Sequence, residues 1–340
     1  MHGALQISIG QLLAEEVPLA PPSGIRAQWW HWAAFGVFVA VMLALDLGVF
    51  HRHSRKPTLR ESTFWTVFWA ALALGFNGLV WHWGGSTAAI QFLTGYLVEW
   101  SLSMDNVFVF AVIFTFFQVP PKYQYRVLFW GILGAIFMRL VFILVGAALI
   151  ARFEWVLLLF GALLVITGIR LAIKDENVNP EHNIFMRFGR RILPVASGSH
   201  GKRFFARENG RWCVTPLFLV LLVVESSDVL FAIDSVPAIF GVTRDPFIVF
   251  TSNVFAILGL RALYFLLAEV MGLFRYLHYG LAAVLIFVGA KMIAEYWFEL
   301  HLFKDNPWIS LAVIAGLLGI AIVASLVAGP EKAEQFEVRR

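Results

Sequence analysis

The sequence contains few charged residues and one cysteine. Asp, Glu, Lys and Arg make up 14% of its 340 residues, and hydrophobic residues make up 60%. Soluble globular domains carry about 25% charged residues, so this composition excludes an ordinary soluble protein and predicts an all-α polytopic membrane protein. The single cysteine, Cys213, excludes an internal disulfide and a thiolate cluster for a soft metal.

The chain also lacks familiar catalytic patterns. It has no Ser-His-Asp arrangement, P-loop or glycine-rich dinucleotide motif in a supporting context, so we do not expect an enzyme. A net charge of +4 could suggest nucleic acid. Because the basic residues are concentrated in short loops, as is usual on the cytoplasmic side of membrane proteins, we expect no nucleic-acid partner.

Hydrophobic runs of about 20 residues, the length that crosses a bilayer, predict nine transmembrane helices. They cover residues 29–50, 62–83, 87–117, 125–150, 153–174, 213–240, 246–271, 277–300 and 307–328. The expected units are a periplasmic segment (1–28), two leading helices (29–86), a first three-helix repeat (87–174), a basic cytoplasmic loop (175–212), a second three-helix repeat (213–300), and a final helix with its cytoplasmic tail (301–340).

The distribution of basic residues predicts the orientation of these helices. Loops 51–60, 118–126, 174–211 and 271–276 and the tail after Gly329 hold 18 of the 26 Lys and Arg. Such loops stay in the cytoplasm, so the N-terminus is expected outside and the C-terminus inside. The basic loop 175–212 is either a linker between two halves or a docking surface for a partner or anionic lipid.

Acidic residues occur inside two of the expected helices. The stretch 99–106 reads Glu-Trp-Ser-Leu-Ser-Met-Asp-Asn, and the spacing from Glu99 to Asp105 recurs from Asp228 to Asp234. A charged residue near the middle of a membrane helix costs about 3 kcal/mol on insertion scales, so such residues usually serve a function. We expect a cation pathway with Asp105 and Asp234 at its symmetry-related centre, and its candidate ligands are Glu99, Asp105, Asn106, Glu225, Asp228 and Asp234.

These side chains offer oxygen ligands, which suit Mn²⁺, Mg²⁺ or Ca²⁺ rather than Zn²⁺ or Cu⁺. One straight helix cannot aim Glu99 and Asp105 at the same ion, because they point about a third of a turn apart. Either the helix unwinds, or the side chains divide between an ion and an arginine. In the second stretch we expect Pro237 to break the helix and to free the carbonyl of Ile233.

Ion pairing is the alternative interpretation of the same acids. Four basic residues also lie in expected helices, and Asp46 adds a sixth acid, so full pairing leaves two negative charges that a divalent cation or two protons would balance. Asp46 is a possible gate or an interfacial residue, and Arg139 and Arg261 are possible ion-pair partners. The four basic residues are Arg139, Arg170, Arg261 and Lys291.

An internal repeat relates the two three-helix units. The acidic stretches align around Asp105 and Asp234, and two later anchors follow in the same order: Arg139 with Arg261, and Arg170 with Lys291. Because each unit has an odd number of helices, its copies enter the membrane from opposite sides. This pattern predicts an inverted-topology repeat, which places ion sites near the midplane.

The acidic stretches 99–108 and 224–240, with the Leu-Asp-Leu-Gly-Val-Phe sequence at 45–50, resemble the TerC family, most closely its Alx-like members. The resemblance extends over about residues 30–328. It implies a multi-pass inner (plasma) membrane protein of manganese homeostasis, with Mn²⁺ as the exported or bound ion. It also implies an alternative role, in which a structural or metalation partner supplies Mn²⁺ to secreted proteins.

A site with several carboxylates can hold either a divalent cation or protons. Export of a divalent cation from a negatively charged cell costs energy, at about 2.3 kcal/mol per charge per 100 mV. We therefore expect cation/proton antiport, with Na⁺ as a second possible coupling ion. The expected partners are the lipid bilayer, a divalent cation, protons and secretion or metalation proteins.

Overall fold

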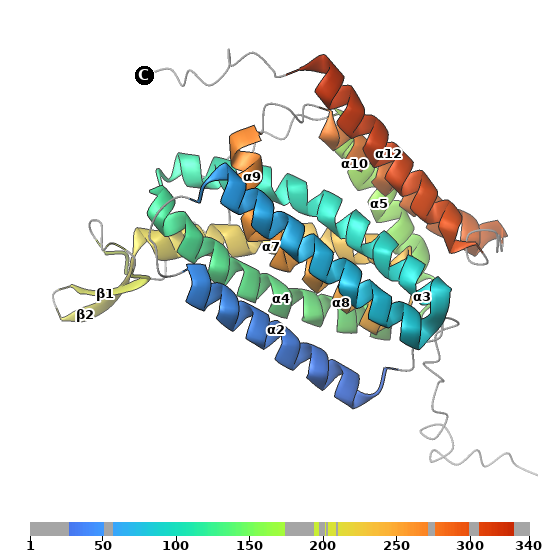
Figure 1. Ribbon diagram of the computed structural model, residues 1–340, viewed down its shortest axis with the longest axis horizontal. Coiled ribbons are helices and arrows are strands. Elements are labelled where there is room, and N and C mark those ends of the chain that lie inside the picture. Colours follow the sequence, from blue (N-terminus) through green and yellow to red (C-terminus); the bar gives the residue numbers. More distant parts are fainter. Residues whose placement is uncertain are drawn as a thin grey trace, which may run out of the picture.

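The computed structural model describes residues 27–50, 57–173, 194–196, 201, 203–208, 210–270, 276–298 and 306–329. Its helices form a bundle, and one β-hairpin lies beside the bundle (Figure 1). The elements are α2 (Trp29–Phe50), α3 (Leu59–Phe116), α4 (Pro121–Arg152), α5 (Val156–Ile173), β1 (Phe205–Glu208), β2 (Arg211–Val214), α7 (Pro216–Phe240), α8 (Pro246–Leu258), α9 (Leu260–Val270), α10 (Leu277–Phe298) and α12 (Pro307–Ala328).

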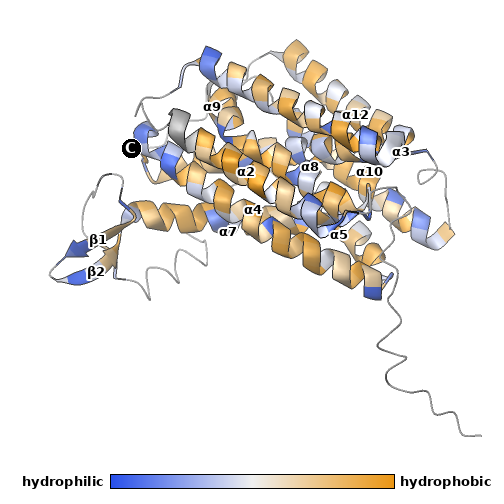
Figure 2. Cartoon of the chain, turned by 60° about the horizontal axis from the view of Figure 1, so that its bottom comes forward, coloured by the Kyte–Doolittle hydropathy of each residue, from blue (hydrophilic) through white to orange (hydrophobic). Residues whose placement is uncertain are grey.

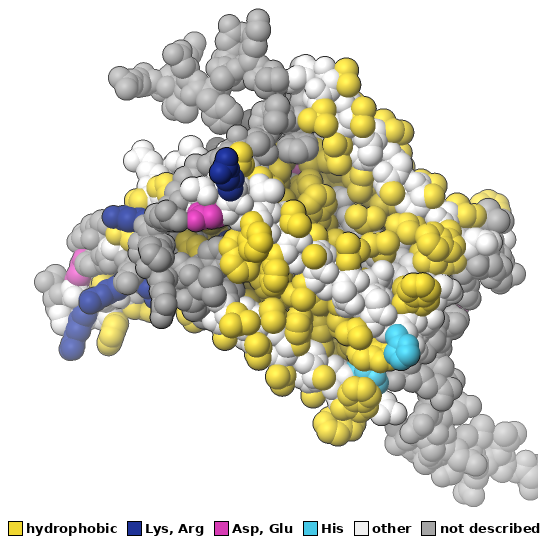
Figure 3. All heavy atoms as spheres, viewed as in Figure 1, with side chains coloured by type: hydrophobic (Ala, Val, Ile, Leu, Met, Phe, Trp, Pro, Cys, Tyr) yellow, Lys and Arg dark blue, Asp and Glu magenta, His cyan; other side chains and the backbone are white. Residues whose placement is uncertain are grey.

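The outer surface of the bundle is apolar. Hydrophobic residues follow the helices along most of their length (Figure 2), and hydrophobic side chains spread over the face seen in Figure 3. Among the described residues, six helices are long and apolar enough to cross a membrane, and the bent pair α8–α9 makes a seventh candidate. The all-α membrane class is therefore confirmed, whereas nine spans and their orientation stay predictions.

Helix α3 accounts for part of the difference in number. It has 58 residues, which in a straight helix would extend for about 87 Å, nearly three times the thickness of the hydrocarbon core. Gly85 interrupts it with φ 76° and ψ −173°, a conformation that favours glycine. In Figure 1 the chain reverses direction along α3, so residues 59–84 and 86–116 form two limbs that correspond to the expected helices 62–83 and 87–117.

Two other expectations about the helices need correction. Helix α7 continues through Pro237 to Phe240, because a proline this close to the C-terminal end leaves few helical hydrogen bonds to lose. The observed break lies instead at Gly259, where α8 and α9 meet at a bend of 42°. The expected span 246–271 is therefore a bent pair.

The start of α7 also differs from expectation. Cys213 lies in strand β2, which pairs antiparallel with β1, and the helix begins at Pro216. Thr215 caps the helix, since its side chain accepts a hydrogen bond from the N–H of Phe218, and its hydroxyl donates to the carbonyl of Arg203. Residues 205–208 and 211–214 thus form a short hairpin, while most of the predicted loop 175–212 lies outside the described residues.

Asp245 fixes the start of α8. One oxygen of its carboxylate accepts hydrogen bonds from the N–H groups of Phe247 and Ile248, at 2.9 and 3.4 Å. Burial raises the pKa of Asp245 to about 6, although these two N–H groups act to lower it. An asparagine keeps the same cap acceptor, so Asp245→Asn removes a charge without removing the cap.

The helices pack in pairs that link the two halves of the chain. Helix α3 packs on α8 and α9, α4 packs on α7, and α5 packs on α10. At the α5–α10 crossing, Gly161 and Gly289 face each other so closely that a Cβ on either would lie within 3 Å of the other's carbonyl oxygen. Small residues allow this close backbone approach, a usual way for membrane helices to associate.

We expect Gly289→Val to destabilise the protein by about 1–3 kcal/mol, the usual cost of overpacking, because the α5 backbone must move. Gly316→Val is the matched control, since a Cβ at Gly316 of α12 meets nothing within 4 Å. Equilibrium unfolding in mixed detergent micelles, followed by tryptophan fluorescence, measures both changes. Equal losses in the two variants would contradict the close α5–α10 crossing.

Candidate functional site

The centre of the bundle holds a buried ion pair between α3 and α4. Nη1 of Arg139 lies 2.5 Å from Oε1 of Glu99, and the two side chains are 2% and 0% exposed. Of the two arrangements considered from the sequence, the structure has the one in which an acid of the 99–106 stretch turns to an arginine. Removing two charges from water is expensive, so such a pair requires further polar contacts.

Asn253 of α8 supplies those contacts to both partners. Its Nδ2 donates to Oε2 of Glu99 at 3.0 Å, and its Oδ1 accepts from Nη1 of Arg139 at 3.0 Å. The amide therefore offers its donor to the carboxylate and its acceptor to the guanidinium. Ser235 of α7 adds a further contact, because its hydroxyl accepts from Nη1 of Arg139 at 2.9 Å. Nε of Arg139 is buried and has no hydrogen-bond partner among the described residues.

Two more acids adjoin this pair. Asp228 of α7 is buried, and its charge interacts with those of Arg139 and Glu99. Glu225, one turn earlier, interacts with Asp228. We call Glu99, Arg139, Glu225 and Asp228 the acidic cluster. Three carboxylates here accompany one guanidinium, so the cluster carries two excess negative charges when all four groups are ionised.

A glycine of α4 makes room for Glu225. A Cβ built on Gly134 would collide with both carboxylate oxygens of Glu225, so the acid lies directly against the helix backbone. Because Gly134 and Arg139 belong to the same helix, α4 provides both the space for one acid and the counter-ion for another. Sequence reasoning did not identify Gly134 as part of the site.

The remaining predicted ligands lie elsewhere on the same helices. Asp234 is half-buried, and its Oδ1 accepts a hydrogen bond from Thr167 of α5 at 3.0 Å. Asp105 is half-buried on α3, where Asn106 is buried. Among the described residues, no three His, Cys, Asp or Glu side chains converge in a way that could hold a metal ion. The structure therefore does not gather the six candidates into one site.

The predicted basic partners have different roles. Arg261 of α9 is buried, and its guanidinium carbon lies 4.4 Å from the ring centroid of Tyr125, a cation–π arrangement. Lys291 lies 3.7 Å from Glu295 and donates to the carbonyl of Gly241 at 3.1 Å, so it has an acid that the sequence-based charge balance omitted. Arg170 is exposed, and the side chain of Asp46 lies outside the described residues.

The part of the chain that contains the acidic cluster is similar to known proteins. Residues 84–333 match the sequence model of the integral membrane protein TerC family. A Myxococcus xanthus protein described as an uncharacterized membrane protein is 52% identical over 297 residues, covering 87% of this chain and 92% of its own. No solved structure matches.

Relatives named Alx carry a more specific description. The putative membrane-bound redox modulator Alx of Escherichia coli strain K12 is 44% identical over 305 residues, covering 86% of this chain and 92% of its own. A Rickettsia bellii membrane protein is 38% identical over 297 residues, covering 87% and 97% of the two chains. The similarity therefore extends over nearly the whole of each relative.

We expect Arg139→Gln to destabilise the protein by about 3–5 kcal/mol, because it leaves Glu99 charged, buried and without its partner. Adding Glu99→Gln should recover part of this loss, so the two substitutions will be strongly non-additive. Unfolding in mixed micelles measures the single and double variants. Arg170→Gln, at an exposed position of α5, is the control and should change stability by less than about 0.5 kcal/mol. Additive effects of Arg139→Gln and Glu99→Gln on the free energy of unfolding would contradict the pairing.

Proposed function

The chain belongs to the TerC family of integral membrane proteins, and from this premise we propose that it exports a divalent cation through the acidic cluster, with Mn²⁺ as the ion to test first. The observation that supports the proposal is the charge of the cluster, three carboxylates to one guanidinium. In apolar surroundings two excess negative charges are costly. Two protons or one divalent cation would neutralise them.

The proposed mechanism is an exchange between these occupants. Protons enter from outside and neutralise two carboxylates, and a cation from the cytoplasm displaces them when the site faces inward. Carboxylate oxygens with Asn and Ser oxygens suit Mn²⁺, Mg²⁺ and Ca²⁺. Arg139 then acts as a tethered counter-ion: it balances Glu99 when the cation is absent, and it must turn away from Glu99 if that acid is to join the ligands.

Coupling to protons follows from the direction of transport. Moving two positive charges outward against 100 mV costs about 4.6 kcal/mol before any concentration gradient. The sequence has no P-loop to supply this energy from a nucleotide. We propose that inward proton movement supplies it, in the cell's inner membrane, with Na⁺ as the other ion to test.

The helix packing supports an inverted repeat as the moving framework. In such a repeat the second limb of α3 corresponds to α7, α4 corresponds to the bent pair α8–α9, and α5 corresponds to α10. The packing of α3 on α8–α9 is then the counterpart of the packing of α7 on α4. Glu99 and Asp228, the first acids of the repeated spacing, are then equivalent residues, and their charges interact. Alternation of two such halves would expose one site to each side in turn.

We expect Asp228→Asn and Glu225→Gln to lower Mn²⁺ efflux from proteoliposomes by about tenfold or more, the effect of losing about 1.4 kcal/mol of binding. The same vesicles contain a pH dye, so each transported cation should be accompanied by proton counterflow. Asp245→Asn is the matched control, because it removes a buried carboxylate outside the cluster and keeps its helix cap.

Normal flux in both cluster variants would remove the transport site from this position. Mn²⁺ movement that follows its own gradient, with neither proton nor Na⁺ counterflow, would replace antiport by a facilitated pathway. Each variant is compared at equal amounts of folded protein, so that loss of flux is not confused with loss of fold.

A structural or metalation role is the second candidate, and the Glu99–Arg139 ion pair favours it, because Glu99 has its counter-ion within the protein. On that proposal the protein holds or hands Mn²⁺ to proteins being secreted, and the basic residues of 175–212 contact the partner. Relatives are called redox modulators, but a thiol exchange within this chain would have to use its single cysteine, Cys213. Cluster variants that yield less folded protein, but whose flux per folded molecule is unchanged, would favour this candidate.

Topology has a direct test in the same cysteine. We propose nine spans with the N-terminus outside, which places Cys213 and the β-hairpin in the cytoplasm. In intact cells a membrane-impermeant maleimide should leave Cys213 unlabelled, and in inside-out vesicles it should label this half-buried thiol. Labelling in intact cells would reverse the orientation. Cys213→Ser is the control for background labelling.

A further inference from the structure

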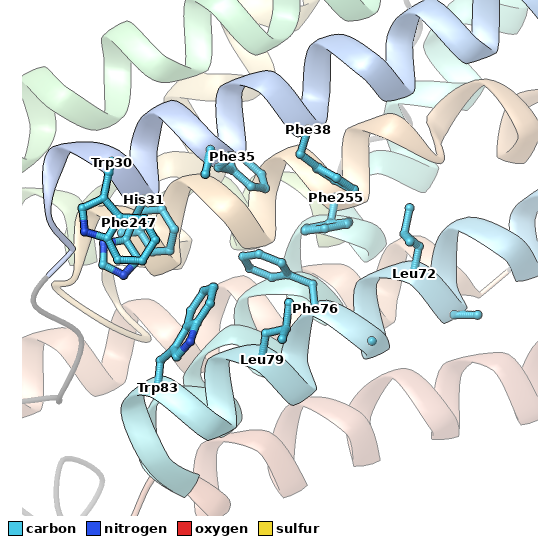
Figure 4. Close-up of a pocket in the computed structure, with 13 residues that line it drawn as sticks. Trp30, His31, Phe35, Phe38, Leu72, Phe76, Leu79, Trp83, Phe247 and Phe255 are labelled. Atoms are coloured by element: carbon cyan, nitrogen blue, oxygen red, sulfur yellow. The ribbon is translucent and has the colours of Figure 1, made fainter.

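An apolar cavity lies outside the acidic cluster, between α2, the first limb of α3, and α8 (Figure 4). Its volume is about 350 Å³, more than twice that of the engineered apolar cavities of about 150 Å³ that bind benzene. Apart from one histidine and the indole N–H groups of two tryptophans its lining is apolar, and aromatic rings predominate. The labelled residues are Trp30, His31, Phe35, Phe38, Leu72, Phe76, Leu79, Trp83, Phe247 and Phe255.

We propose that this cavity binds one acyl chain of a membrane phospholipid, with the ester carbonyl of that lipid hydrogen-bonded to His31. An apolar cavity of this size does not hold stable water, and leaving it empty would forfeit the contacts that stabilise packed interiors. An apolar chain of the surrounding bilayer is the occupant always at hand. The proposal is independent of the transported ion.

The gradient of burial across the cavity fits a chain entering from the bilayer. Its floor is formed by Phe35 and Phe255, which are 4% and 1% exposed, whereas Trp30 and Trp83 at its rim are 44% and 43% exposed. Among the described helices α2 packs most closely on α8, and aromatic contacts such as Phe35 with Phe76 connect it to α3. A lipid chain would fill the remaining space.

The rim also lies where lipid carbonyls are found. Four exposed tryptophans, Trp29, Trp30, Trp81 and Trp83, lie at the start of α2 and at the end of the first limb of α3. Tryptophans of this kind mark the membrane–water interface. A phospholipid with its head group at this level would place its ester carbonyls beside the rim and its chains toward the floor.

His31 provides a hydrogen-bond donor for recognition, beside the indole N–H groups of Trp30 and Trp83. Its Nδ1 accepts a hydrogen bond from the N–H of Gln28 at 3.0 Å, so the neutral ring carries its proton on Nε2. Within the described residues no acceptor contacts Nε2. The ring stacks on Trp30 and meets Trp83 and Phe247 edge-on, which holds this donor at the rim, where a lipid carbonyl would accept its hydrogen bond.

A larger side chain at Gly75 would fill the cavity, which makes the proposal testable. A Cβ on Gly75 meets nothing within 4 Å, and Gly75 lines the cavity. Gly78, on the same limb, also has open space around its Cβ but does not line the cavity. Gly75→Leu and Gly78→Leu change helix propensity equally, so a difference between the two variants reports occupancy of the cavity.

The experiment uses delipidated full-length protein in detergent, titrated with palmitoyl-oleoyl phosphatidylglycerol and observed by native mass spectrometry. We expect one tightly retained phospholipid in the wild type and in Gly78→Leu, and about tenfold weaker retention in Gly75→Leu, a loss of about one decade in affinity. Equal retention in all three proteins would overturn the proposal, as would a co-purified quinone or detergent in place of the phospholipid.

A dialkyl ether analogue of the same lipid tests the carbonyl contact. The ether lipid should bind about two- to tenfold more weakly to the wild type, the range expected for one hydrogen bond. His31→Phe keeps an aromatic ring and removes the Nε2 donor, so the difference between ester and ether lipids should disappear in this variant. Equal affinities of the two lipids for the wild type would overturn the role of His31.

Discussion

The arrangement of the bundle depends on one buried ion pair and the amide that bridges it. Glu99 and Arg139 lie on α3 and α4, and Asn253 brings α8 to both of them, while Ser235 adds α7. In hydrocarbon or a packed interior, an incomplete network of this kind is more costly than an apolar contact. Four helices therefore meet at a fixed register, and the nearby acids inherit their positions from it.

Close backbone contacts maintain the rest of the packing around this network. Gly161 and Gly289 allow α5 and α10 to cross, and Gly134 allows Glu225 to lie against α4. Bulk hydrophobicity does little to hold helices together inside a bilayer, because lipid tails are equally apolar. Steric fit at small residues and hydrogen bonds at polar residues thus determine which helices are neighbours, and Gly134 brings the first kind of contact to the acidic cluster.

Sequence reasoning identified features that had a local signal. Hydrophobic runs marked helices, and charged residues inside them drew attention to Glu99, Glu225, Asp228 and Arg139, whose role in transport stays a prediction. It failed where the answer depended on contacts between distant segments: Asn253 lies 154 positions from Glu99, and only its place in an apolar helix, after Thr251 and Ser252, marked it as unusual. The expected break at Pro237 was wrong because α7 ends three residues later, whereas Gly259 carried no comparable signal.

The shared location of Gly134 and Arg139 on α4 has a mechanical consequence. Five residues separate them, which corresponds to about 7.5 Å along the helix axis. A rigid screw motion of α4 would therefore withdraw the guanidinium and shift the surface against which Glu225 rests in a single displacement. Glu99 and Glu225 would then share one degree of freedom, so their occupancies would change in concert.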